Sequence, residues 1–173
     1  MDFKVGSKVF YPTHGAGWIK DKKKIEFNGE KKTYFEFDFI TSRIRVSTPI
    51  ENLGMLNVRH VLTPNEIKKY ISELKKSPTK DPKTKEFNKL MDIFEDLEEK
   101  ANIKSTIQTI QICNFVKKRR EKDGRLIPVT IEKEQARAIS DIAGELAVSS
   151  DTKLETAAKT FEKLSGIETK IFS

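Results

Sequence analysis

Residues 31–40 read Lys-Lys-Thr-Tyr-Phe-Glu-Phe-Asp-Phe-Ile, and this stretch decides the fold of the first part of the chain. Its three phenylalanines alternate with two acidic residues, so an extended chain places the rings on one face and the carboxylates on the other. Just before it, Asn28-Gly29 is the dipeptide that adopts the positive φ angles of a two-residue hairpin turn. We therefore predict a β-hairpin whose first arm spans residues 16–27. Its aromatic face could stack on nucleic-acid bases, but packing in a small barrel core is favoured.

Shorter strands are predicted on either side of this hairpin. Val9-Phe10-Tyr11 is a short apolar run closed by Pro12. In residues 43–46, Ile44 and Val46 alternate with two arginines, which predicts a strand with the aliphatic side chains inward and the arginines outward. Four or five short strands in about sixty residues are too few for a sandwich and favour a small SH3-like or Tudor-like barrel.

Beyond residue 62 the hydrophobic period becomes that of helices. Thr63–Glu66 (Thr-Pro-Asn-Glu) combines an N-cap, a proline at the first helical position and a glutamate that closes a capping box. Apolar residues at helical spacing predict four more helices, and Phe87 lies on the apolar stripe of the first of these. The expected caps or starts of the last three are Asn102, Thr130 and Asp151.

The change of period divides the chain into two domains. We predict an α+β fold with a small N-terminal SH3/Tudor-like β-barrel over residues 1–62. An all-helical domain of about five helices is expected over residues 63–166. Residues 167–173 are expected to form a loose C-terminal tail.

Composition argues against several classes of protein. The 173 residues include 33 Lys and Arg and 26 Asp and Glu, for a formal net charge of +7. The single cysteine, Cys113, excludes an internal disulfide and a thiolate-rich metal cluster. His14 and His60 lie far apart and outside any ligand-spaced motif, and no phosphate-binding glycine motif is present. We expect no catalytic residues, no metal and no cofactor.

The sequence also predicts where the protein resides. Its longest apolar run is far shorter than the ~18 residues that a membrane span needs. The first six residues lack the apolar stretch of a secretory signal. We expect a cytoplasmic protein with no membrane partner.

Positive charge is concentrated in residues 117–125, which contain six basic and two acidic side chains. Clustered cations at a helix end can simply complement the helix dipole. Five basic residues among the six at 117–122 exceed that need, so phosphate contact with a nucleic acid is favoured. The cluster at 20–24 is weaker evidence, because lysines also protect edge strands. The six cations of the run are Lys117, Lys118, Arg119, Arg120, Lys122 and Arg125.

Residues in both halves are similar to a known family, the CarD-type bacterial transcription regulators (CarD/CdnL family). The similarity is specific over the first sixty residues and more diffuse afterwards. Its N-terminal carriers are Phe3-Lys4-Val5-Gly6, Val9, Tyr11-Pro12, His14-Gly15-Ala16, Gly29-Glu30, Lys32, Tyr34, Val46, Pro49, Glu51-Asn52 and Val58-Arg59, and its C-terminal carrier is Gly144-Glu145-Leu146-Ala147.

The resemblance implies a non-enzymatic regulator of transcription initiation. Its N-terminal domain would bind the RNA polymerase β subunit, and its helical domain would contact promoter DNA at the upstream edge of the bubble. This arrangement would stabilise the open complex. The implied polymerase-binding residues are Lys24, Arg43, Arg45 and Ser47. Well-studied members carry an arginine where this chain has Ser47, so Arg43 and Arg45 are expected to supply the cation.

A second departure concerns DNA. Family members place a tryptophan wedge in the minor groove, whereas Lys85 stands near that position here. Phe87 could replace the wedge, but its place on the predicted apolar stripe favours the core. The implied DNA-contacting residues are the six cations of the 117–125 run together with Lys83, Lys85, Phe87 and Lys89.

Two rival functions remain open at this point. A stand-alone DNA-binding regulator would act at promoters without polymerase contact, and a protein–protein adaptor would bind no DNA even at low salt. An enzyme is remote, because no nucleophile–base pair or metal-ligand pattern is visible. The expected partners are the RNA polymerase β subunit and promoter DNA, with no small-molecule substrate. The expected location is the cytoplasm, at the nucleoid.

Overall fold

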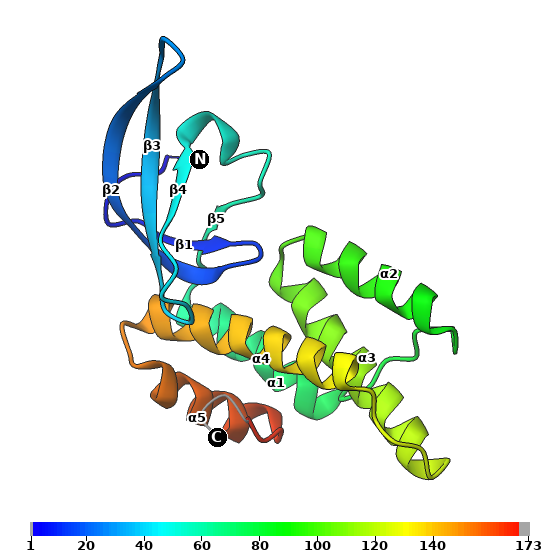
Figure 1. Ribbon diagram of the computed structural model, residues 1–173. Coiled ribbons are helices and arrows are strands. Elements are labelled where there is room, and N and C mark those ends of the chain that lie inside the picture. Colours follow the sequence, from blue (N-terminus) through cyan, green and yellow to red (C-terminus); the bar gives the residue numbers. More distant parts are fainter. Residues whose placement is uncertain (1, 170–173) are drawn as a thin grey trace.

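The computed structural model describes residues 2–169, in which a five-stranded antiparallel sheet is followed by five helices (Figure 1). The α+β fold class with a Tudor-like N-terminal part is confirmed. No helix among the described residues is both long and apolar enough to span a bilayer. The elements are β1 (Lys8–Tyr11), β2 (Gly15–Phe27), β3 (Glu30–Phe39), β4 (Val46–Pro49), the 3₁₀ turn η1 (Ile50–Asn52), β5 (Arg59–His60), α1 (Pro64–Lys76), α2 (Phe87–Glu99), α3 (Ile103–Lys122), α4 (Val129–Ser150) and α5 (Leu154–Ser165).

The sheet is built around the predicted hairpin. Its strand order is β4-β3-β2-β1-β5, and the β2–β3 turn contains Asn28 and Gly29 at φ angles of 49° and 77°. A register shift between Ile19 and Asp21 marks a bulge in β2, and bulges of this kind bend a strand and increase its twist. The far half of the hairpin projects beyond the rest of the sheet (Figure 1).

The three alternating phenylalanines, Phe35, Phe37 and Phe39, are buried as predicted. They form one core cluster with residues of β1, β2 and the segment after η1, including Ile19 and Val58. Their rings are therefore enclosed by the sheet and do not offer a stacking platform for bases.

One strand prediction was wrong. Strand β4 begins only at Val46, which pairs with Phe37, and Ile44 is 61% exposed instead of facing the core. The Ser42 hydroxyl accepts a hydrogen bond from the Ile44 amide at 3.1 Å, which holds residues 42–44 in a bend before the strand. Alternation over four residues does not specify a strand when backbone pairing with β3 starts later.

Local capping chemistry was predicted well at two helices and poorly at two others. The capping box of α1 is present, with the Thr63 hydroxyl accepting from the Glu66 amide, and Asn102 caps α3. Thr130 is not a cap, because α4 already begins at Val129 after Pro128. Asp151 does not start α5; it adopts the left-handed conformation that ends α4.

Helix α4 joins the two halves of the molecule. It packs against β1 and β2 on one side and against α1, α3 and α5 on the other. A small apolar cluster of Phe10, Ala16 and Val148 fills the contact with the sheet, and the partly buried Trp18 packs against it.

The predicted division at residue 62 stays a prediction, since the sheet and the helices share these contacts. Residues 170–173 of the predicted tail lie outside the described part. Within it, Ile167 packs against the helical core and the Thr169 amide donates to Glu162 at 2.8 Å.

Candidate nucleic-acid and protein interfaces

The loop before α2 lies along α3 and brings two basic stretches together. The Gln111 side chain donates to the Ser77 carbonyl at 2.7 Å, and the Asn114 side chain donates to the Pro78 carbonyl at 2.8 Å. Further along, the Arg119 guanidinium lies 3.4 Å from the Thr84 carbonyl. The 83–89 segment and the 117–125 run, distant in sequence, therefore form one surface. We call this the basic end: Lys83, Lys85, Lys89, Lys118, Arg119, Arg120, Lys122 and Arg125.

The cations of the basic end differ in whether a carboxylate or carbonyl group of the protein already binds them. Lys83 and Lys89 have carboxylate neighbours at 3.7 Å and 3.1 Å, while Lys85 has none within 4.0 Å among the described residues. The Arg120 guanidinium donates to the Leu126 carbonyl at 3.1 Å. The guanidinium of Arg119 also lies over the Phe115 ring. These contacts orient the arginines without neutralising them.

Lys117 belongs to a different environment from the rest of the run. Its ammonium bonds to Glu132 at 2.8 Å and to the Gln135 side chain, and only 21% of its side chain is exposed. An ammonium paired in this way has less to offer to a phosphate. Its partners lie on the next helix, α4, and therefore could not be identified from the charge run.

Phe87 is not a core residue, which corrects the favoured interpretation of the sequence. It is 44% exposed, whereas Leu90, Phe94 and Leu97 further along α2 are buried. Phe87 is the first residue of α2, and the apolar stripe that it begins is buried only from Leu90 onward. An exposed aromatic ring thus stands between Lys85 and Lys89 in the sequence.

The α3–α4 turn carries two further exposed apolar side chains that the sequence analysis missed. Leu126 is 91% exposed and Val129 is also open to solvent. Leu126 directly follows Arg125, the last cation of the basic run, and Val129 directly follows Pro128; these positions were the only available signal.

The polymerase-binding residues implied by the resemblance do not lie on one face of the sheet. Ser47 pairs with Glu36 on β3, and Lys24 pairs with Thr33. Glu36 and Thr33 differ by an odd number of positions, so their side chains point to opposite faces. Arg43 and Arg45 are exposed in the segment that precedes β4, a few residues before Ser47.

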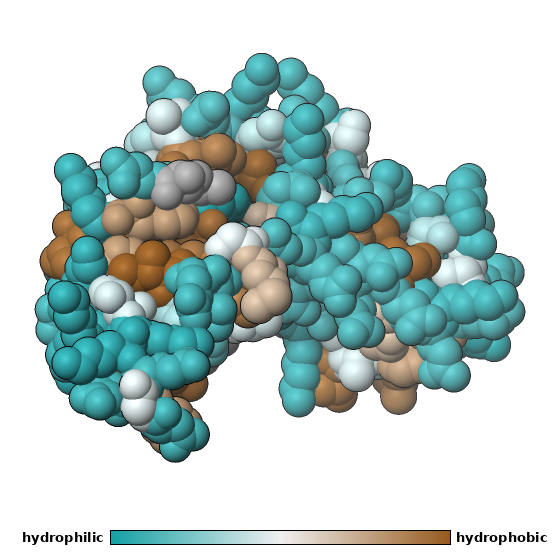
Figure 2. All heavy atoms as spheres, turned by 90° about the horizontal axis from the view of Figure 1, so that it is seen from above, coloured by the Kyte–Doolittle hydropathy of each residue, from teal (hydrophilic) through white to brown (hydrophobic). Residues whose placement is uncertain are grey.

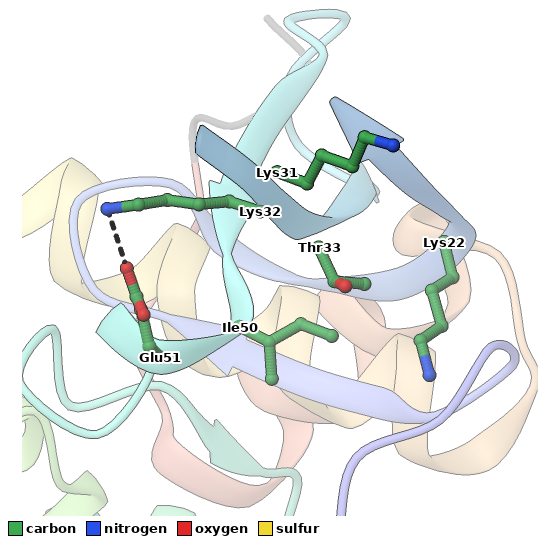
Figure 3. Close-up of a pocket in the computed structure, with 6 residues that line it drawn as sticks. All are labelled: Lys22, Lys31, Lys32, Thr33, Ile50 and Glu51. Carbon is green, nitrogen blue, oxygen red and sulfur yellow. Dashed lines mark ion pairs between the residues drawn. The ribbon is translucent and has the colours of Figure 1, made fainter. Parts of the chain in front are cut away.

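The face that contains Lys24 has a hollow beneath the hairpin (Figure 3). This hollow measures about 410 Å³, with Ile50 and Thr33 among its lining residues. Lys32 is paired with Glu51 at 2.9 Å, whereas Lys22 and Lys31 have no carboxylate within 4.0 Å among residues 2–169. Cross-strand register adds Lys22 and Lys31 to the predicted Lys24; only their membership in lysine clusters was visible in the sequence.

A buried ion pair fixes the sheet to α4. Arg59 donates two hydrogen bonds to Glu145, at 2.7 Å and 3.0 Å, and Glu145 is only 2% exposed. The same carboxylate accepts from the Leu62 amide at 3.0 Å, and the Arg59 guanidinium lies 4.6 Å from the Phe10 ring centroid. Close approach at this contact depends on Gly144, where an added Cβ would lie 3.2 Å from the Thr41 methyl group.

A second cluster on α4 lies near the same contact. Arg137 bonds to Glu134 and Asp141, both at 3.0 Å, and Glu98 lies at 3.8 Å. Burial raises the pKa of Asp141 to about 7, and the neighbouring Arg137 opposes that rise. This is a structural charge cluster, and no group of three or more metal-ligating side chains occurs among the described residues.

Comparison with known proteins identifies the sheet domain. Residues 3–62 match the family described as the CarD-like/TRCF RID domain. The chain is also similar to the "Putative transcription factor YdeB" of Bacillus subtilis (strain 168), with 34% identity over 59 residues. These residues are 34% of this chain and 39% of that relative, so the match spans well under half of either protein.

Residues 3–62, which contain the whole sheet, are thus similar to a CarD-like domain. Both findings concern the first part of the chain, where they agree with the resemblance seen in the sequence. The family match ends at residue 62, immediately before the capped start of α1.

Proposed function

We propose that this protein is a non-enzymatic regulator of transcription initiation that acts in the cytoplasm, at the nucleoid. Its N-terminal domain binds the RNA polymerase β subunit, and its helical domain contacts promoter DNA near the upstream edge of the bubble and stabilises the open complex. The observation that carries the proposal is the match of residues 3–62 to an RNA polymerase-interacting domain family.

The sheet offers two surfaces for an acidic protein partner. Strand β4 is an edge strand, preceded by the exposed Arg43 and Arg45, and an unpaired edge can accept a partner's strand. The second surface is the hollow lined by Lys22 and Lys31, on the face of the hairpin that also carries Lys24. Because Ser47 cannot supply a cation, we assign the electrostatic part of β-subunit binding to these flanking arginines and lysines.

The basic end supports the DNA contact. Its cations lie on a loop and at a helix terminus, a pattern suited to phosphate contact and not to base readout by a recognition helix. Binding should therefore tolerate sequence changes and depend strongly on salt. The exposed Phe87 ring, with lysines on either side, is suited to insert between base steps at a bubble edge.

The ion pair between Arg59 and Glu145 links these two activities. A sheet bound to polymerase can hold the basic end at one position only if the two halves move as a unit. The buried contact through α4 supports that rigidity. We infer that the contact sets where the basic end meets the promoter.

The test is capture of polymerase by the full chain. Arg43→Glu with Arg45→Glu should abolish capture while leaving the circular dichroism spectrum unchanged. Lys69→Glu with Lys159→Glu makes the same charge change on exposed helical positions and should leave capture intact. Undiminished capture by the first variant would remove these arginines from the interface. Promoter binding without any polymerase contact would favour the stand-alone DNA-binding regulator.

A further inference from the structure

A groove lies where the sheet domain meets the end of α2. It measures about 540 Å³ and is lined by the β1–β2 turn, by the loop after η1 and by the last two turns of α2. The Asn57 side chain donates to the Glu99 carbonyl at 3.3 Å and ties the loop to the helix end. We call this the junction groove; its lining residues include Thr13, Met55, Leu56, Glu95, Glu98 and Glu99.

The junction groove is negatively charged, although it lies at the negative end of the α2 dipole and the protein as a whole is positively charged. Helix α2 has no basic residue in its last turn, and carboxylates at a helix C-terminus interact unfavourably with the macrodipole. Of the three glutamates in the groove, Glu98 alone lies within 4.0 Å of a guanidinium. Glu95 and Glu99 have no such partner among the described residues. An acidic patch that destabilises its own helix, in a chain of net charge +7, favours a cationic ligand.

Part of the lining of the groove is apolar. Met55 is 77% exposed, and Leu56 beside it is also accessible. A free ion or a bare polycation would leave these side chains in water. The groove therefore suits a peptide segment that combines several cations with one aliphatic side chain.

The chain itself carries such a segment at the α3–α4 turn. Lys122 and Arg125 are exposed there, next to the 91%-exposed Leu126. The turn cannot reach the groove of its own molecule, because α3 begins beside the groove and its 20 residues span ~30 Å before the turn. Figure 1 shows the start of α3 close to the end of α2, and the α3–α4 turn at the other end of α3.

We propose that the junction groove binds the α3–α4 turn of a second copy of this protein. Leu126 packs on Met55 and Leu56, while Lys122 and Arg125 pair with Glu95 and Glu99. The contact is head-to-tail because the two surfaces differ: in a pair, one molecule keeps its turn free and the other keeps its groove free. Self-association covers part of the basic end, so duplex DNA and a second copy compete for it. The proposal does not depend on polymerase binding.

The view from above shows how polar and apolar side chains are distributed over one face of the molecule. Hydrophilic side chains cover most of the right-hand part, where α2 and α3 lie, and apolar side chains reach the surface in patches over the left-hand part (Figure 2). A contact confined to one groove and one turn buries far less surface than the interface of a stable dimer. We therefore expect a weak complex.

Sedimentation velocity of the full chain tests the proposal. The average mass should rise with protein concentration at about 50 mM salt and return to that of the monomer at about 500 mM salt, where charges are screened. Glu95→Lys with Glu99→Lys should weaken association by about tenfold or more, since two attractive pairs become repulsive. Lys122→Glu with Arg125→Glu should do the same. Glu26→Lys with Glu73→Lys changes the net charge like the groove variant, away from the groove, and should preserve association.

Mixing the two defective variants provides the decisive measurement. Each supplies a surface that complements the other's altered one, so the mixture should associate although neither variant does so alone. A short duplex DNA should dissociate the wild-type assembly. A wild-type chain that stays monomeric at low salt, or a mixture that does not associate, overturns the proposal. Binding of a peptide of residues 120–128 to the groove of a monomeric chain would show instead that the groove serves a basic segment of another protein.

Discussion

Replacing Glu145 is expected to separate binding from function. Glu145→Ala removes both hydrogen bonds from Arg59 and the acceptor of the Leu62 amide. Breaking a buried pair by removing one partner costs roughly 3–5 kcal/mol. Arg59 keeps its bond to the Ala101 carbonyl at 2.9 Å and is itself 19% exposed, which favours the lower end, ~3 kcal/mol. Because a domain is commonly stable by only ~5–15 kcal/mol, this loss is large yet compatible with folding.

Urea unfolding followed by tryptophan fluorescence measures the effect. Trp18 is the only tryptophan and packs against the cluster between the sheet and α4, so its signal reports on the contact itself. Glu145→Gln keeps an acceptor for Leu62 and should cost less, ~1–2 kcal/mol. The double replacement Arg59→Leu with Glu145→Leu should recover part of the loss, because no charge is left buried.

Activity provides the second half of this test. Below its unfolding range, the Glu145→Ala protein should still capture polymerase and still bind DNA, because neither surface includes Glu145. Open complexes should nevertheless decay faster, since the basic end is no longer held at a set distance from the sheet. A free-energy loss below about 1 kcal/mol, or unchanged open-complex lifetime in a measurably destabilised variant, would refute the reasoning.

Three further predictions concern Phe87, the basic run and Asp141. Phe87→Ala should shorten open-complex lifetime while changing the free energy of unfolding by less than ~1 kcal/mol, because the ring is exposed; a loss of ~3–5 kcal/mol in urea unfolding would mean that it is packed after all. Neutralising Lys118, Arg119 and Arg120 to glutamine should reduce the log–log salt slope of duplex binding by ~0.9 per lost phosphate contact, whereas Lys117→Gln should leave the slope nearly unchanged and lower stability through its lost pair with Glu132. Asp141 has a pKa raised from 3.8 to about 7, so the folded state binds its proton more tightly than the unfolded state, and its contribution to stability declines as pH rises from about 4 to 7. Asp141→Asn should remove that decline from a pH series of urea midpoints, and an unaltered difference between the two proteins across this range would contradict the assignment.

Local patterns in the sequence determined the elements of the fold. The Asn28-Gly29 turn, the three alternating phenylalanines and the Thr63–Glu66 capping box each act through neighbours within a few residues. Their outcome therefore depends little on the rest of the chain, and all three were predicted correctly. The same local logic predicted the existence of five helices but not every boundary, since Pro128 placed the start of α4 ahead of the expected Thr130 cap.

Only the tertiary structure decided which side chains are available. Phe87 belongs to an apolar stripe in the sequence, yet at the first residue of α2 it is 44% exposed, whereas Leu90 in the same turn is buried. Lys117 belongs to a basic run, yet Glu132 on the following helix occupies its ammonium. The partnership of Arg59 with Glu145, 86 residues apart, leaves no periodic trace in the sequence. Burial and ion pairing are properties of surfaces that meet only after the chain has folded, so a one-dimensional pattern specifies the elements but not the contacts between them.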